Sequence, residues 1–425
     1  MCTTGHNSYK GCRFCYIEGV YANRHVYYPL KPPNNRSTTR YNPGALPKRS
    51  HTTYERDVAA VMSAVGTAAR NKEKKNRGMG ISSDFRKRAG RCPKFNISFA
   101  GINSHSILFE LRSISFPDSF PVDVMHCLFE NVAPAMFRHW NGTFFKVGLS
   151  QTVCTLPPST WQAIGEVMER NRENMPTDFG RAPIDIHRHA SGFKAEQWLS
   201  WILCYTRCHF STITFRKGIY VVESSRKLMD NNIIFLSFSR IVKGWAKFVK
   251  ATKLCLEWEI TDREVEEIKK LFRDFCCALR KVCMRTVTLV CSSSQASRVT
   301  IGARFREYIR RDSERLSATL MSFHYVLHIA DSIRNTGPAW ATWQFPMERL
   351  CGMLLPLVRS RQHPYVNLRN QITTWLRFAH LEYNIGAKAN VFRSISENSH
   401  IWPLHRVSAL QKVLRNSIRH TAYLL

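Results

Sequence analysis

The sequence predicts an α+β fold that is mostly helical, and three observations support this prediction. Apolar residues recur at helical spacing in most of the chain after Pro121, whereas strand-like alternation is confined to a stretch before it. The chain has 425 residues, enough to bury a core and, at ~150 residues per domain, to form two or three domains. Hydrophobic residues make up 44% and aromatic residues 12%, a globular mixture that excludes a disordered tail.

The first part of the chain combines turns, a helix and a basic stretch. Residues 1–50 are turn-rich and basic, which predicts a small ligand-holding module rather than a core. Apolar residues at helical spacing from Tyr54 to about Ala69 predict a helix. Residues 70–94 hold ten Lys and Arg against two acids, with Gly and Ser interspersed, and we expect them to form a mobile loop.

Strand-like sequence follows, and then helices. Short alternating apolar runs between Phe95 and Phe120 predict strands or buried segments. A capping box, Thr261 to Glu264, opens the clearest helix, which carries one apolar stripe through Leu279. The other expected helices are Ser159 to Met168, Ala195 to Tyr205, Glu314 to Arg334 with a stop at Gly337-Pro338, and Pro346 to Val358, which Pro356 shortens or kinks.

The charge of the chain points to a polyanionic partner. Lys and Arg number 62 against 31 Asp and Glu, a net charge of +31. This favours nucleic acid or an anionic membrane surface as partner. A merely solubilising surface is the alternative, although solubility is usually served by a smaller net charge of mixed sign. Because no stretch approaches ~18 consecutive apolar residues and no signal peptide is visible, we expect an intracellular chain that does not insert into membranes.

The basic stretch is the candidate segment for DNA contact. Two of its clusters, Lys74-Lys75 and Arg86-Lys87-Arg88, have the form of a two-part nuclear import signal, which predicts a nuclear location. Chance is the alternative, since basic clusters recur in so basic a protein. The candidate DNA-binding residues are Lys72, Lys74, Lys75, Arg77, Arg86, Lys87, Arg88 and Arg91.

Two cysteines stand apart from the other twelve. The 14 cysteines are spread through a long chain, so disulfides are not needed and most are interpreted as small buried side chains. Cys12-x-x-Cys15 instead has the spacing that places two thiolates on one tetrahedral zinc ion, or that forms a redox dithiol. Its natural complement is His324-x-x-x-His328, because residues i and i+4 share a helix face.

The spacing alone does not decide whether the two cysteines and the two histidines form one site. The gap between the two halves is far too long for a zinc finger, so two buried core histidines are an equal alternative. A zinc protease is disfavoured, because its general base would be a Glu directly after the first His, and Tyr325 stands there. Asp123 and His126, in a Pro-bounded turn, fit an ordinary capped helix start, and Glu348, in the first turn of an apolar helix, fits a residue that stabilises the helix dipole.

Taken together, these motifs resemble one family, the CACTA (En/Spm-like) DDE transposases in their fungal form. The stretches that carry the resemblance, in family order, are Gly5 to Cys15, Ser106 to Leu111, Phe120 to His126, Phe323 to His328, and Gly337 to Leu350. The resemblance implies a truncated ribonuclease-H-like catalytic core with a large α-helical insertion. It also implies DNA binding to transposon ends and target, and, in the intact parent, DNA strand cleavage and transfer.

The resemblance assigns roles to six residues. Cys12, Cys15, His324 and His328 would form a structural zinc site, His126 would be the core histidine near the active site, and Glu348 would be the last acid of the catalytic triad. In the intact parent, three carboxylates would hold a pair of Mg²⁺ ions. The implied organisation is a zinc-module segment over 1–50, helix and basic loop over 51–94, core remnant over 95–150, helical insertion over 151–313, and C-terminal helices over 314–425.

The chain also departs from the family. The first two triad aspartates precede the C-x-x-C pair in the family, whereas nothing acidic comes before Glu18 here, so we expect the chain as given to be truncated and catalytically incomplete. Residues 214–240 and 286–304 interrupt family-like sequence and are interpreted as translated introns or insertions. The rival interpretation is a non-catalytic DNA-binding or chromatin-associated derivative; assembly with further copies of the chain stays open.

Overall fold

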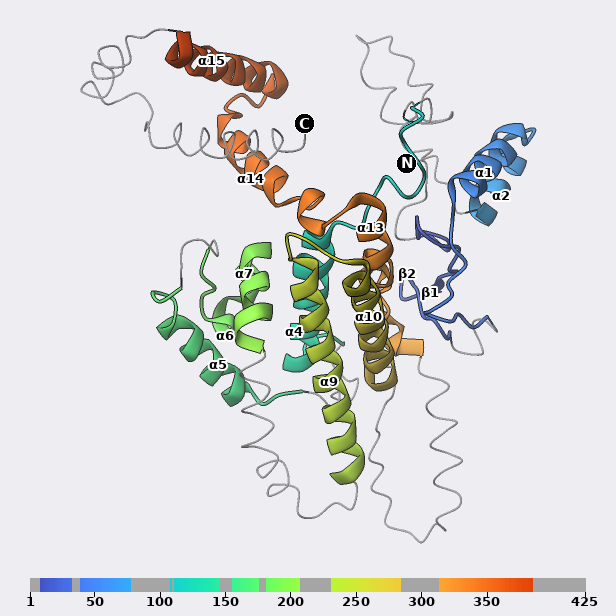
Figure 1. Ribbon diagram of the computed structural model, residues 1–425, viewed down its shortest axis with the longest axis vertical. Helices are drawn as coiled ribbons and strands as arrows, with labels where there is room; N and C mark the ends of the chain where they lie inside the picture. Colours follow the sequence, from blue (N-terminus) through green and yellow to red (C-terminus); the bar gives the residue numbers. More distant parts are fainter. Residues whose placement is uncertain are drawn as a thin grey trace. The chain divides into compact units, whose positions relative to one another are not determined.

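The computed structural model describes residues 8–32, 39–77, 108, 111–145, 155–175, 181–206, 231–283 and 313–384 (Figure 1). The chain divides into two compact units, residues 1–344 and 345–425. The described part is mostly helical, as the sequence predicts, and its only sheet has two strands. No described sheet corresponds to a ribonuclease-H-like core.

A small hairpin forms the N-terminal part of the first unit. Strands β1 (Val20–Ala22) and β2 (His25–Tyr27) pair antiparallel across a two-residue turn whose residues, Asn23 and Arg24, both have positive φ. Such a turn matches the right-handed twist of the strands. The buried face of the hairpin packs on Leu316, so this segment contributes to a hydrophobic core. The sequence predicts a ligand-holding module rather than a core here.

Two helices follow, where the sequence predicted one helix and a loop. Helix α1 (His51–Ser63) begins at Ser50, whose hydroxyl accepts from the Thr53 amide, and α2 (Thr67–Arg77) begins after Gly66, which has φ +83°. The prediction of a loop from residue 70 is therefore wrong up to Arg77. An ion pair within α2, Arg77 to Glu73 at 2.8 Å, and a second to Asp57 of α1 at 3.0 Å stabilise this helix. Residues 78–94 lie outside the described part.

The stretch predicted as strand lies mostly outside the described residues, and the end that is described is not a strand. Residues 111–120 form turns, with the Ser119 amide donating to the Ser115 carbonyl and the Phe120 amide to the Pro117 carbonyl. Pro117 has no N–H to give to a strand ladder, which explains the difference. Phe116 is fully buried and stacks on Tyr54 of α1.

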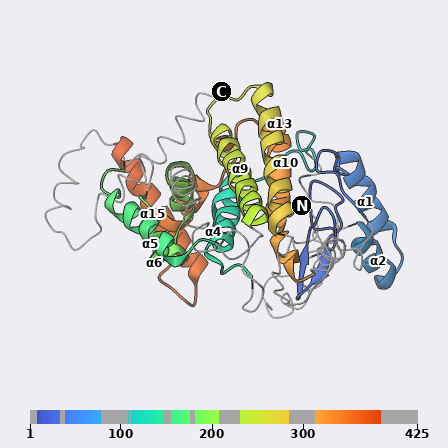
Figure 2. The same cartoon turned by 90° about the horizontal axis from the view of Figure 1, so that it is seen from below.

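The rest of the first unit is built from helices. These are the π-helix η3 (Met125–Val132), α4 (Ala133–Asn141), α5 (Pro158–Arg170), α6 (Ile186–His189), η5 (Ala190–Gly192), α7 (Ala195–Ser200), the π-helix η6 (Trp201–Tyr205), α9 (Asn231–Cys255) and α10 (Asp262–Cys283). Helices α9 and α10 lie side by side in both views (Figures 1 and 2). The predicted helices 159–168 and 195–205 and the capping box at Thr261 are confirmed.

An aromatic core joins these helices. Trp245 of α9 packs edge-on against Trp140 of α4 at 4.8 Å between ring centroids and stacks on Phe248 at 4.5 Å. Phe248 in turn contacts Phe275 of α10 at 4.8 Å. Burial of such large rings supplies most of the apolar area of a core. Residues 231–240 of the suspected insertion lie in α9, whereas 214–230 and 286–304 are outside the described part.

The long helix predicted from Glu314 to Arg334 is broken into four short pieces. These are η7 (Ser313–Ala318), α12 (Met321–Tyr325), η8 (Val326–His328) and α13 (Ile329–Thr336). The prediction of one continuous helix is wrong because the Thr319 carbonyl accepts from the Tyr28 amide at 2.9 Å and Leu320 is extended. Gly337, with φ +87°, ends α13 where the sequence predicts a stop.

The second unit contains α14 (Phe345–Leu354), η10 (Leu355–Leu357) and α15 (Pro364–Asn384). Helix α14 stops before Pro356, as predicted. Among the described residues, no helix has both the length and the apolar character that a membrane span requires.

Candidate metal centre

Four predicted side chains from opposite parts of the chain meet in one buried group. The Sγ atoms of Cys12 and Cys15 and one ring nitrogen each of His324 and His328 all lie within 4.8 Å of one another. His324 Nε2 is 3.2 Å from Cys12 Sγ and 3.3 Å from Cys15 Sγ. His328 Nε2 is 3.1 Å from His324 Nε2 and 3.6 Å from Cys12 Sγ. Both cysteines are free thiols, and the group could hold a metal ion.

The loop that carries Cys12 and Cys15 is held by residues 47–49, which run beside it. The Tyr16 amide donates to the Pro47 carbonyl, and the Arg49 amide donates to the Phe14 carbonyl, both at 2.8 Å. Between the two cysteines the chain turns so that the Phe14 amide donates to Cys12 Sγ at 3.4 Å. The turn directs both sulfurs to one side, as the C-x-x-C spacing predicts.

The histidine half depends on the break in the predicted helix. His324 lies on α12 and His328 at the end of η8, four residues apart and on one face, as predicted. Aromatic rings fix both imidazoles: Phe14 stacks on His328 at 5.1 Å between centroids, and Tyr28 lies nearly parallel to His324 at 6.2 Å. Both histidines are buried, and their Nε2 atoms face the two thiols, so the structure brings together the two halves whose pairing the spacing left open.

A buried arginine supports the thiol loop from behind. Arg49 Nε donates to the carbonyls of Cys12 and Cys15 at 3.1 and 3.4 Å, and its guanidinium lies over the Tyr16 ring. Its counter-charge is Asp57, at 3.5 Å, and both side chains are 1% exposed. Asp57 also accepts from the Tyr16 hydroxyl at 2.6 Å. The backbone of the thiol loop is thus held by a buried charged network of Arg49, Asp57 and Tyr16.

A second charged group ties the two halves together from outside. Asp331 of α13 pairs with Lys48 at 2.9 Å and with Lys269 of α10 at 3.5 Å. Burial would raise the pKa of this carboxyl, but the hydrogen bond and charge of Lys48 and the charge of Lys269 outweigh burial and lower the pKa. Lys48 neighbours the arginine behind the thiols, and Asp331 follows His328 by three residues, so this pair bridges both halves of the site.

The pKa values of the two thiols shift in opposite directions. For Cys12, burial would raise the pKa, but a hydrogen bond with Cys15 and electrostatic interactions with His324 and His328 outweigh burial and lower the pKa well below its usual value. For Cys15, burial and then the hydrogen bond with Cys12 raise the pKa. Burial lowers the pKa of His328, which favours the neutral ring that a metal requires. The lowered pKa of Cys12 favours the thiolate form, which is the form that binds a metal.

The predicted site residue His126 belongs to a separate, more exposed cluster. Its Nδ1 contacts the Asp123 carboxylate, and its Nε2 is 3.6 Å from Glu130 Oε2. Asp123 Oδ1 also accepts from the Met125 amide at 3.1 Å, so the predicted capped helix start is confirmed. His126 is 40% exposed at the side chain and opens a π-helix.

The remaining predicted site residues are dispersed. Glu348 lies in the first turn of α14, as predicted, in the second unit. Among the basic candidates, Lys72 is exposed and Lys74 is half-buried on α2, and Lys75 lies on the same helix. Arg77 is instead committed to Glu73 and Asp57, which makes it a structural residue. Arg86, Lys87, Arg88 and Arg91 lie outside the described residues.

Sequence reasoning missed the residues that support the site. Arg49 and Asp57 hold the thiol loop, and Phe14 and Tyr28 cover the imidazoles. Nothing in the sequence distinguishes Arg49 from the exposed Lys48 beside it. A helical pattern that placed Asp57 beside Val58 and Val61 on the buried side of α1 was the only available signal.

The comparisons with known proteins add no relative: no protein family, no curated protein and no solved structure matches the chain. The interpretation of the site therefore depends on its own geometry and on the sequence motifs that form it.

Proposed function

We propose that this chain is a DNA-binding protein derived from a CACTA-type transposase, in which a structural zinc ion fastens the N-terminal segment to the segment carrying His324 and His328. The observation that carries the proposal is the meeting of Cys12, Cys15, His324 and His328 in one buried group. The resemblance assigned these four residues to one site, whereas their spacing alone left the pairing open. Their convergence supports the resemblance as well as the metal site.

The interatomic distances suit zinc. With Zn–N near 2.0–2.1 Å and Zn–S near 2.3 Å, a tetrahedron has edges of about 3.3 Å between two nitrogens and about 3.6 Å between sulfur and nitrogen. The corresponding edges here are 3.1 Å between the two Nε2 atoms and 3.2 to 3.6 Å between sulfur and nitrogen. Thiolate and imidazole are also the ligands that tetrahedral zinc prefers.

The character of the site favours a structural role. All four ligand positions come from buried protein side chains, which leaves no open position for a substrate or a reactive water. A zinc hydrolase is disfavoured for that reason and because Tyr325 stands where a general base would be. A redox dithiol is disfavoured because both imidazoles face the thiols. When bound, zinc would supply a crosslink between two segments far apart in the sequence.

The charge of the chain supports DNA as the partner. A net charge of +31 requires many anionic contacts for neutralisation, and duplex DNA offers a dense row of phosphates. Among the described candidates, Lys72 is exposed on α2 and belongs to the most basic stretch of the sequence. Truncating such a phosphate contact would weaken binding to all sequences alike.

Strand cleavage and transfer belong to the intact parent that the resemblance implies. Glu348 would supply one of three carboxylates for two Mg²⁺ ions there, and His126 would lie near them. The ribonuclease-H-like core is part of the same proposal. DNA binding needs neither the Mg²⁺ ions nor the triad, so it can be tested on this chain directly.

The test is fluorescence anisotropy of the full zinc-loaded chain with a labelled duplex over a range of salt concentrations. We expect the logarithm of the affinity to fall linearly with the logarithm of salt concentration, and Lys72→Gln to reduce that slope by about 1. Lys270→Gln, an equal loss of charge at an exposed position of α10, is the control. Absence of binding at low salt, or a salt-independent affinity, would contradict the proposal.

A further inference from the structure

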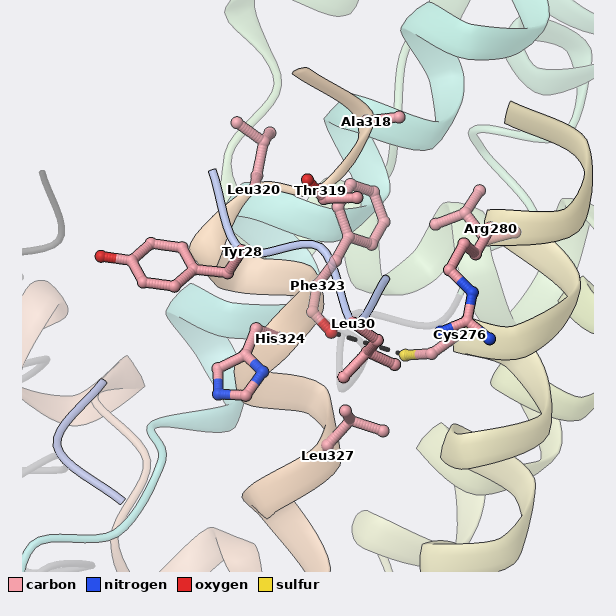
Figure 3. A pocket seen from close by; sticks show the side chains of 11 residues that line it. Tyr28, Leu30, Cys276, Arg280, Ala318, Thr319, Leu320, Phe323, His324 and Leu327 are labelled. Carbon is pink, nitrogen blue, oxygen red and sulfur yellow. Dashed lines mark hydrogen bonds between the residues drawn. The ribbon is translucent and has the colours of Figure 1, made fainter. Parts of the chain in front are cut away.

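A cavity lies directly behind one of the four ligands of the metal centre. It has a volume of about 40 Å³ and lies between the N-terminal segment, α10 and the segment from Ala318 to Leu327 (Figure 3). This volume counts only the space that the centre of a water molecule can reach. On that measure roughly 10–15 Å³ holds one water molecule, so the cavity admits a ligand the size of about three waters. His324 and Arg280 both line it.

Two buried nitrogen atoms at this cavity have no hydrogen-bond partner among the described residues. They are Nδ1 of His324, a residue that is 4% exposed, and Nη1 of Arg280. In Figure 3, one ring nitrogen of His324 is directed toward the side of the cavity where Arg280 lies. Because the Nε2 atom faces the thiols, the nitrogen on the cavity side is Nδ1.

Both orphan atoms are donors. When the Nε2 of a histidine binds a metal, its Nδ1 carries the proton, and metal-binding histidines almost always give that proton to an acceptor. The guanidinium of Arg280 has donors only and keeps its charge. The Arg280 side chain is half-buried, but its Nη1 is shielded from solvent and lacks a partner, which is costly, so the cavity favours an acceptor and in particular an anionic one.

No acceptor among the described residues reaches either nitrogen. The Thr319 hydroxyl donates to the Leu316 carbonyl, the Tyr28 hydroxyl donates to the Ser8 carbonyl, and the Cys276 thiol donates to the Phe323 carbonyl. None of the residues that line the cavity is an Asp or Glu, and no described carboxylate pairs with Arg280. An acceptor from solution would supply what the described residues do not.

We propose that this cavity binds a small inorganic anion of halide size, held between Arg280 Nη1 and His324 Nδ1. The inference rests on the metal centre proposed above and gives it a further component: the anion accepts the Nδ1 proton, orients the ring and makes Nε2 a stronger ligand. Outer hydrogen-bond partners of this kind typically change metal affinity by 10- to 100-fold. Chloride is the anion used as probe.

The test measures the zinc dissociation constant of the full chain by competition with a chelator, in sodium chloride and in sodium gluconate at equal ionic strength. Gluconate is too large for the cavity, so we expect zinc to bind about 10-fold more weakly in it. Arg280→Gln removes the difference between the two salts, whereas Lys270→Gln, an equal loss of charge on the same helix, retains it. An equal chloride effect in both variants, or no effect in the wild-type chain, overturns the proposal.

A second measurement needs no variant. Crystals of the wild-type chain grown in bromide should show an anomalous peak in the cavity between Arg280 and His324. A water molecule there without anomalous signal overturns the anion site. Metal analysis separates this inference from the proposed function: a chain that binds zinc without any chloride effect contradicts only the anion site, and a chain that binds no zinc contradicts the metal centre.

Discussion

Arg49 and Asp57 form an ion pair in which both side chains are 1% exposed, with Arg49 Nη1 3.5 Å from Asp57 Oδ2. The pair lies immediately behind the thiol loop, because Arg49 Nε also donates to the carbonyls of Cys12 and Cys15. Arg49 also donates from Nη1 and Nη2 to the Arg77 carbonyl, both at 3.1 Å. These two hydrogen bonds extend the network to α2. The loop that presents the thiols therefore has protein contacts of its own in addition to the four-residue group.

Replacing Asp57 by Asn should destabilise the chain strongly. The change leaves the buried Arg49 guanidinium without its counter-charge, and breaking one partner of a buried pair typically costs about 3–5 kcal/mol. Arg56→Ala is the matched control, because Arg56 pairs with the same carboxylate at 3.2 Å but is 62% exposed. We expect that control to cost at most ~1 kcal/mol. Urea unfolding measures both; equal losses in the two variants would show that burial of the pair is unimportant.

The Asp331 pairs should make part of the stability depend on pH. The pKa of Asp331 is lowered in the folded chain, so its contribution is present above the unfolded value, about 3.9, and is lost as pH falls through the folded pKa. Asp331→Asn should cost about 1 kcal/mol at neutral pH, and the cost should decline below pH ~4 and vanish below the lowered folded pKa.

The control for Asp331 is Asp118→Asn. Asp118 is an exposed carboxylate whose described partner is the neutral amide of Asn335, at 2.9 Å. We expect that variant to behave like the wild-type chain, within ~0.5 kcal/mol, throughout the same pH range. A cost of Asp331→Asn that stays constant in acid would contradict the role given to its charge.

The sequence predicts the four ligands of the site but not the contacts that bring them together. The ligands were predictable because C-x-x-C and H-x-x-x-H each place two donors on one side of a local turn or helix, whatever the rest of the fold does. Their meeting depends on tertiary contacts, such as the Thr319 carbonyl accepting from the Tyr28 amide, which also broke the predicted helix. Local periodicity contains no information about that contact.

The same reasoning explains which elements were predicted. Helix α10 begins at a capping box and carries a continuous apolar stripe, so its start and its buried face follow from local sequence. Helix α2 has no apolar stripe and is stabilised by the ion pairs of Arg77 with Glu73 and Asp57. A basic segment without a stripe is typical of a loop, and the tertiary ion pair with Asp57 adds to the local pair with Glu73 at the end of this helix.

Removing the metal with a chelator should loosen the two segments that it joins, while the aromatic core keeps its protection. We expect faster amide hydrogen exchange in residues 11–30 and 321–336, because the crosslink between them is lost. Helix α9 should change little from Trp245 onward, since its stability comes from ring packing with α4 and α10. Exchange that is unaffected by chelation in both segments would contradict a structural metal.

The most direct test of the central claim is the absorption spectrum of the full chain loaded with Co²⁺, together with the bound metal per chain. The account predicts one Co²⁺ per chain, with the strong visible bands of a four-coordinate site and a thiolate charge-transfer band. Both should be lost in Cys15→Ser and His328→Ala and kept in Cys204→Ser, which changes an exposed cysteine. A chain that binds no metal, or whose spectrum survives loss of Cys15 or His328, would contradict the account.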